Sequence, residues 1–194
     1  MADLNIEVTY FEKGGPHNTS KALEIAKKYA DQFDIREIVI ASTTGTAASK
    51  ALEFFNPKKY NIVIITHSYY FAGINNRQEF SEDLMENLRE QGLKIFSGTH
   101  SMAGIERSMR KSLNQWSPVE ILAKYLRTNF SQGVKVCMEI VSMAADAGLI
   151  KDLEKDVISI GGTGRGADTV CWIKPMPTSF FDQLRVKAIL AKPL

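Results

Sequence analysis

Short apolar runs of strand length alternate with helix-like patterns along most of this 194-residue chain, and this alternation restricts its fold more than any other feature. The runs predict strands over residues 35–41, 61–66, 94–97, 134–138 and 157–160. Right-handed crossovers place the intervening helices on both faces of a parallel sheet. We therefore expect a three-layer α/β/α fold with a mainly parallel sheet.

Both ends of the chain add strands to this pattern. Residues 6–11 predict a short strand, and residues 169–173 and 186–190 predict extra strands at one edge of the sheet. No linker, internal repeat or low-complexity segment interrupts the sequence. We therefore expect a single domain over residues 1–194.

One helix has an especially clear start. Ser117, Pro118 and Glu120 occupy the cap, the first helical position and the third helical position. Its apolar face is predicted to consist of Ile121, Leu122, Tyr125 and Leu126.

Composition excludes several classes of protein. The formal net charge is only +2, from 24 basic and 22 acidic residues, so we expect no nucleic-acid partner. The longest apolar runs, such as residues 62–65, are too short to span a bilayer, and the N-terminus has no signal-peptide pattern. We therefore expect a cytoplasmic protein without a membrane partner. Cys137 and Cys171 lie far from other thiols, and the three histidines are scattered, which predicts buried cysteines and no structural metal.

Small, hydroxyl-bearing or ionisable residues follow the predicted strands. They are Ser42, Thr43, Thr44, Gly45 and Thr46, then His67, His100, Glu139, and Gly161 with Gly162. Ligands of open parallel sheets bind beyond the carboxyl ends of the strands, so we predict a binding site there. The segment from Ser42 to Thr46 suits a phosphate, although a plain helix cap would use the same residue types.

The ionisable residues have alternative roles. His67 and His100 could each relay a proton, form a hydrogen bond with a ring heteroatom of a ligand, or be purely structural. Glu139 could bind sugar or ribityl hydroxyls or act as a base, with Arg165 as its nearest counter-charge in the absence of a ligand.

A glycine-rich loop, GGTGRGAD, follows the last of the main strands. It contains Gly161, Gly162, Thr163, Gly164, Arg165, Gly166 and Asp168. Glycine lets backbone N–H groups approach an anion, and arginine suits a phosphate or carboxylate. The loop could also be a wide hairpin turn, in which Asp168 accepts backbone N–H groups. Its spacing matches neither the dinucleotide fingerprint nor a P-loop.

Six segments of the chain, taken in order, match a known family, and the resemblance covers nearly the whole chain. They read VIASTTGTAASKALE, THS, SGTHSMAGIERS, KVCMEIVSMAADAG, ISIGGTGRGADTVCWIKP and FFD. This order resembles the stand-alone prokaryotic proteins related to the C-terminal α/β domain of pyruvate kinase. The most specific matches are residues 104–108, 143–146 and 161–169.

The resemblance implies a pyruvate kinase C-terminal domain-like fold and flavin mononucleotide (FMN) bound in the crevice. In pyruvate kinase, loops like residues 43–47 and 161–168 bind a phosphorylated effector in some members. The chain lacks the catalytic barrel, so we do not expect pyruvate kinase activity. Tyr69, Tyr70 and Phe71 could cover a flavin ring or pack on the domain.

Three functions remain open from the sequence. The first is binding of FMN or a similar phosphorylated small molecule; the second is a flavin-dependent oxidoreductase. The third is a regulatory module that senses a sugar phosphate through a partner or through self-association as a homo-oligomer. Fold analogy does not choose among them.

Overall fold

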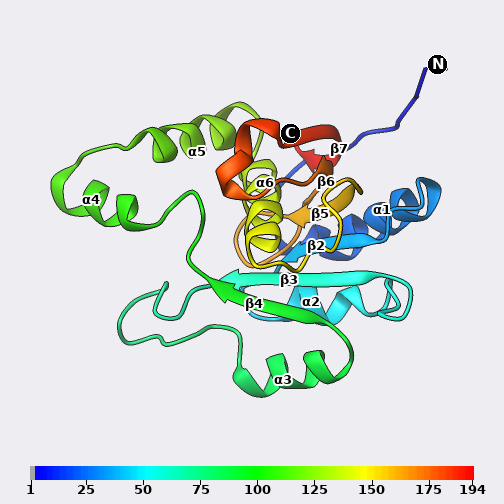
Figure 1. Ribbon diagram of the computed structural model, residues 1–194, viewed down its shortest axis with the longest axis horizontal. Coiled ribbons are helices and arrows are strands. Elements are labelled where there is room, and N and C mark those ends of the chain that lie inside the picture. Colours follow the sequence, from blue (N-terminus) through cyan, green and yellow to red (C-terminus); the bar gives the residue numbers. More distant parts are fainter. Residues whose placement is uncertain (1–2) are drawn as a thin grey trace.

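The computed structural model describes residues 3–194 as a three-layer α/β/α fold around a seven-stranded sheet (Figure 1). The strands are β1 (Thr9–Phe11), β2 (Glu37–Ala41), β3 (Asn61–His67), β4 (Lys94–Gly98), β5 (Val157–Gly161), β6 (Thr169–Lys174) and β7 (Arg185–Pro193). The helices are α1 (Thr19–Gln32), α2 (Thr46–Ala51), α3 (Glu82–Glu90), α4 (Ile105–Leu113), α5 (Pro118–Asn129) and α6 (Gln132–Asp146), with short 3₁₀ segments η1 (Pro16–Asn18) and η2 (Thr178–Gln183).

The sheet order is β1-β7-β6-β5-β2-β3-β4. Strands β5, β2, β3 and β4 are parallel, whereas β6 runs antiparallel to both β5 and β7. The predicted edge strands near the C-terminus are thus present. The predicted strand over residues 6–11 is shorter, since only Thr9–Phe11 pair with β7.

Alternate side chains of the central strands enter two separate cores. Ile38 and Ile40 of β2 pack on the side of α1, α2 and α3, while Val39 packs on the side of α6. Both cysteines belong to the second core. The two cores account for the continuous apolar runs in the sequence, because a parallel sheet is covered on both faces.

The order of connections creates a switch point between β2 and β5. From β2 the chain steps outward through α2, β3, α3 and β4, and then returns through α4, α5 and α6 to β5 on the other side of β2. The carboxyl ends of β2 and β5 are therefore adjacent, with α2 and α6 on opposite faces of the sheet. This is where ligands bind in open α/β folds.

The predicted strand over residues 134–138 is wrong, because this segment lies in α6. The Ser131 side chain accepts the Val134 N–H at 3.1 Å and caps the helix. The buried side of α6 carries a stripe at helical spacing, formed by Val134, Cys137, Ile140, Val141 and Ala144. Packing of this stripe overrides the strand preference of Val134 and Val136. Glu139 consequently lies inside a helix and not after a strand.

Helix α6 lies unusually close to the sheet at its N-terminal end. A Cβ atom at Gly133 would lie 2.0 Å from the Thr169 hydroxyl, so any larger residue would push the helix away. This contact fixes the position of the first turns of α6 relative to β6.

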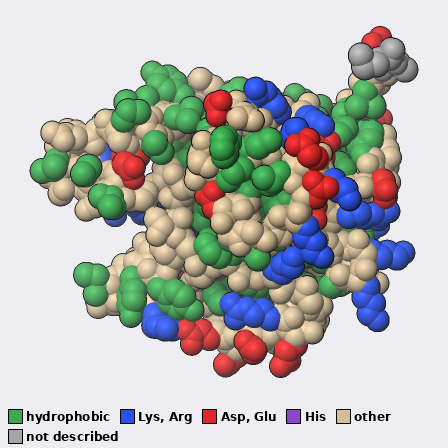
Figure 2. Space-filling model, viewed as in Figure 1, with side chains coloured by type: hydrophobic (Ala, Val, Ile, Leu, Met, Phe, Trp, Pro, Cys, Tyr) green, Lys and Arg blue, Asp and Glu red, His purple; other side chains and the backbone are tan. Residues whose placement is uncertain are grey.

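The predicted apolar face of α5 does not enter the core. Ile121, Leu122 and Tyr125 are 41%, 42% and 59% exposed, whereas the side chains that α5 buries are Glu120 and Ala123. The reason is the position of α4 and α5, which form an arm extending from the body of the fold (Figure 1). Apolar side chains gather on the surface of this arm (Figure 2). Within residues 3–194, no helix combines the length and apolar character of a membrane span.

Candidate functional site

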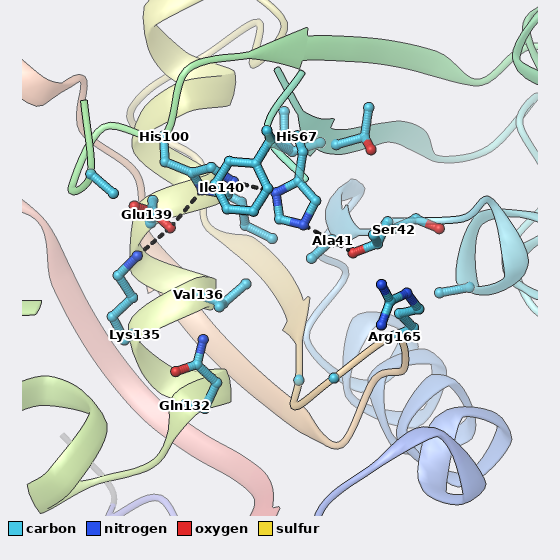
Figure 3. A pocket seen from close by; sticks show the side chains of 18 of the residues that line it. Ala41, Ser42, His67, His100, Gln132, Lys135, Val136, Glu139, Ile140 and Arg165 are labelled. Atoms are coloured by element: carbon cyan, nitrogen blue, oxygen red, sulfur yellow. Dashed lines mark hydrogen bonds and ion pairs between the residues drawn. The ribbon is translucent and has the colours of Figure 1, made fainter. Parts of the chain in front are cut away.

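A cleft of about 150 Å³ lies at the carboxyl ends of β2, β3 and β5, with one face of α6 as its wall (Figure 3). It continues into a more open hollow of about 430 Å³ between α4 and the loop after β3 (Figure 2). The two spaces share six residues, namely Thr43, His67, Phe71, Arg107, Gly164 and Arg165. A ligand can therefore extend from one into the other.

Nine of the residues predicted from sequence line the inner cleft. They are Ser42, Thr43, His67, His100, Glu139, Gly162, Gly164, Arg165 and Gly166. Six others do not line it: Thr44, Gly45, Thr46, Gly161, Thr163 and Asp168.

The segment after β2 is used largely to begin α2. The Ser42 hydroxyl accepts the Ala48 N–H at 3.3 Å, and the hydroxyls of Thr44 and Thr46 bond to each other at 3.0 Å. Gly45 occupies the cap position of α2, and no side chain of the segment caps the helix there. Thr43 is the member of the segment whose hydroxyl faces a cleft histidine.

Asp168 anchors the glycine-rich loop from behind. Its fully buried carboxylate accepts the N–H groups of Gly15 and Thr163 at 2.8 and 3.1 Å, and the Thr169 hydroxyl at 2.9 Å. Gly161 also has a packing role, since a Cβ atom there would lie 2.8 Å from the Gly133 carbonyl oxygen. These residues hold the loop in place while Gly162, Gly164 and Arg165 face the cleft.

The two histidines and Glu139 form a hydrogen-bonded chain (Figure 3). Glu139 Oε2 lies 3.0 Å from His100 Nδ1, and His100 Nε2 lies 2.5 Å from His67 Nδ1. His67 Nε2 then faces the Thr43 hydroxyl at 3.2 Å. The chain runs from a buried carboxylate to the inside of the cleft.

Glu139 is held as a carboxylate by several donors. The Lys135 ammonium lies 2.5 Å from its Oε2 atom, and the Met102 N–H donates to its Oε1 atom at 2.9 Å. Burial alone would raise the pKa of Glu139, but the hydrogen bond from His100 and the charge of Lys135 lower it to about 2. Burial lowers the pKa of Lys135, against the opposing effect of Glu139.

His67 is the ring that the cleft presents to a ligand. Burial lowers the pKa of His67 to about 4, and a positive charge on His100 would act in the same direction. Phe71 stacks on the His67 ring, with 4.0 Å between centroids, and the Arg107 guanidinium lies 4.2 Å from the Phe71 centroid. Of the three aromatic residues in this loop, Phe71 enters the cleft, while Tyr69 and Tyr70 are 39% and 54% exposed.

Four basic side chains line the inner cleft, and two of them are paired with carboxylates. Lys135 pairs with Glu139, and Arg165 pairs with Glu79 at 2.5 Å rather than with Glu139 as expected. Within residues 3–194, neither Arg107 nor Arg127 lies within ion-pair distance of a carboxylate. The cleft therefore carries excess positive charge.

Sequence reasoning missed the residues that the helices contribute. They are Arg107 of α4, Arg127 of α5, and Gln132, Lys135, Val136 and Ile140 of α6. A usable signal was present for α6: positions 132, 135, 136, 139 and 140 repeat at helical spacing and lie on one face. Among the described residues, no group of three or more histidine, cysteine, aspartate or glutamate side chains is placed to hold a metal ion.

No family model matches the chain.

Proposed function

We propose that the protein binds a phosphorylated small molecule in this cleft, with FMN as the first candidate. The main evidence is a pair of arginines in the cleft, Arg107 and Arg127, for which the described residues provide no carboxylate partner. Both arginines are half-buried. A guanidinium is stabilised by a nearby anion, and its planar fork matches phosphate oxygens. A phosphate is thus the group that best complements the charge of the cleft.

The glycine-rich loop supports the same proposal. Gly164 has a left-handed backbone with φ of 68°, and the loop is held rigidly by Asp168. Backbone N–H groups in such turns make concave anion sites. Together with Arg165, this loop would hold the phosphate from the side opposite α6.

The remaining lining suits the rest of a flavin nucleotide. Phe71 and Ile140 offer apolar contacts, and Thr43 and Gln132 offer polar atoms to a ring or ribityl chain. The inner cleft alone is below the usual ligand-pocket range of about 300–1,000 Å³, so a ligand of this size would also occupy the outer hollow. When bound, FMN would supply hydride or electron transfer, and the protein would orient it.

The first experiment is the absorption spectrum of the purified protein from about 300 to 550 nm, followed by mass spectrometry of any small molecule released on denaturation. A flavin band with the mass of FMN is the expected result. A colourless protein that releases or binds a sugar phosphate would keep the anion site and remove FMN. A protein that binds neither ligand in calorimetry would contradict the proposal.

Substitution of the two arginines tests whether they hold the ligand. Arg107→Gln and Arg127→Gln should each weaken FMN binding by about tenfold to a hundredfold, the loss expected for one charge-assisted hydrogen bond. Arg89→Gln, at an exposed position of α3 where Arg89 pairs with Glu86, is the control and should leave affinity unchanged. Unchanged affinity in both cleft variants would exclude the arginines from the site.

The exposed apolar arm favours a second candidate, a ligand sensor that acts through self-association. Ile105, Leu113 and Tyr125 are 76%, 62% and 59% exposed, and exposed apolar patches commonly mark interaction surfaces. Sedimentation with and without FMN tests this candidate, because a sensor should change its assembly state on binding. A flavin enzyme should instead be reduced by NADH or NADPH with turnover, which the absorption spectrum measures. A cytoplasmic location remains a proposal from sequence.

A further inference from the structure

With both rings neutral, the Glu139–His100–His67 chain has one consistent hydrogen-bond direction in the empty cleft. Glu139 is a carboxylate, so His100 Nδ1 must carry the proton that bridges them at 3.0 Å. In a neutral ring the other nitrogen is then an acceptor, so His67 Nδ1 must donate to His100 Nε2. His67 Nε2 is left with a lone pair that accepts from the Thr43 hydroxyl.

One added proton reverses what His67 offers to the cleft. If a proton from solvent binds His67 Nε2, the Nδ1 proton can shift across 2.5 Å to His100 Nε2. The positive charge then lies on His100, directly beside the Glu139 carboxylate. His67 Nε2 becomes a donor, and the Thr43 hydroxyl turns so that its oxygen accepts, without movement of any heavy atom.

The surroundings oppose this proton while the cleft is empty. The groups that face the pair are Lys135 and Glu139 of α6, Arg107 of α4, Arg127 of α5, Glu79 before α3, and Arg165 of the glycine-rich loop. Lys135 already neutralises Glu139, and Arg165 already pairs with Glu79. Burial of the His67 ring opposes a further positive charge most strongly, and the Arg107 guanidinium adds to this opposition, whereas Glu79 and Glu139 act in the other direction.

An anion in the cleft offsets the electrostatic part of this opposition. Its charge offsets Arg107 and Arg127 and attracts a proton to the nearest group that can accept one, His67 Nε2. We propose that the His67–His100 pair takes up one proton when an anion binds in the cleft, so that His67 changes from hydrogen-bond acceptor to donor toward the ligand. The proposal rests on the proposed anion site, and it adds that the site is an acid–base device as well as a binding site.

Sulfate is a suitable probe, because it resembles phosphate but does not itself titrate near neutral pH. Calorimetry in two buffers with different ionisation enthalpies measures the protons taken up on binding. We expect uptake approaching one proton, and a sulfate affinity that falls by up to about tenfold per pH unit as the pH rises through the range of uptake.

Three variants separate the pair from its surroundings. His67→Gln should abolish the uptake and flatten the pH dependence. Thr43→Val, which removes a hydroxyl but keeps both rings, should weaken binding and retain the uptake. His17→Gln, an exposed histidine outside the cleft, should behave as wild type. Binding without proton uptake, or equal uptake in His67→Gln, would overturn the proposal while leaving the anion site intact.

A ligand-free measurement keeps the proposal testable if sulfate does not bind, an outcome that would count against the anion site itself. Nitrogen-15 NMR reports which imidazole nitrogen carries the proton. In the empty protein the proton of each ring should lie on Nδ1. A proton on Nε2 of either ring in the empty protein would contradict the assigned direction and with it the switch.

Discussion

Each end of the cleft contains one ion pair, and the two pairs differ mainly in burial. The side chains of Lys135 and Glu139, at the inner end, are 3% and 1% exposed. Those of Arg165 and Glu79, at the mouth, are 64% and 16% exposed. The inner pair joins two residues of one helix, whereas the outer pair joins two loops that are far apart in the sequence.

This difference indicates separate roles. A buried pair is fixed, because neither charge can return to water without large rearrangement. An exposed pair contributes little to stability, and its members can exchange partners. The inner pair therefore holds the histidine chain in position, whereas the outer pair can open to let Arg165 contact a ligand.

The largest effect should follow from breaking the inner pair. Lys135→Met keeps the length of the side chain but leaves the Glu139 carboxylate buried with one donor fewer. We expect a loss of about 3–5 kcal/mol in the free energy of unfolding, measured with urea. Lys21→Met, which breaks an exposed pair with Glu24 within α1, should cost no more than about 1 kcal/mol.

A double variant distinguishes charge from packing in this result. Lys135→Met with Glu139→Gln removes both charges and retains an acceptor for the Met102 N–H. Most of the lost stability should return. Equal instability of the single and double variants would show that lost packing, and not an unpaired carboxylate, caused the effect.

Acid should weaken the inner end next. The pKa of Glu139 is about 2 in the folded protein against an ordinary value of 4.5, so the unfolded chain binds this proton first as the pH falls. Its contribution of about 3 kcal/mol is complete above pH 4.5 and is lost progressively between pH 4.5 and pH 2. Urea unfolding at a series of pH values should show a weaker decline in Glu139→Gln than in wild type. Parallel curves would contradict the assigned charge of Glu139.

The fold was predictable where a single local pattern decided it. The central strands of the sheet are continuous apolar runs because both faces are covered, and four of the five predicted runs are strands. Residues 134–138 failed because alternating valines resemble a strand over five residues, while the helical repeat becomes visible only over the full length of α6. The exposure of the apolar face of α5 was also not predictable, because an apolar stripe does not reveal what it packs against.

The residues of the candidate site were likewise predictable only where a local pattern placed them. Thr43, His67 and Gly164 could be placed together because parallel strands bring their carboxyl ends to one edge. Arg107 and Arg127 could not be placed there, because they lie on α4 and α5. How these helices pack back toward the cleft is not visible in any local sequence pattern. The charge pairing was also not predictable: Arg165 meets Glu79, from the loop before α3, and not Glu139.

The smallest change in stability should come from the outer pair, where the informative effect is on binding. Glu79→Gln frees Arg165 and should alter the free energy of unfolding by less than about 1 kcal/mol. It should strengthen FMN binding by a few-fold, because the ligand no longer competes with a carboxylate for the guanidinium, while Arg165→Ala should weaken it. Glu82→Gln breaks the neighbouring exposed pair with Arg77 and is the control for a general change in loop charge.

Opposite shifts from the two halves of one ion pair, with no shift in the control, would identify Arg165 as a ligand-binding group. If Glu79→Gln also weakens binding, the outer pair instead holds the mouth of the cleft in its binding shape, as the inner pair does for the histidines.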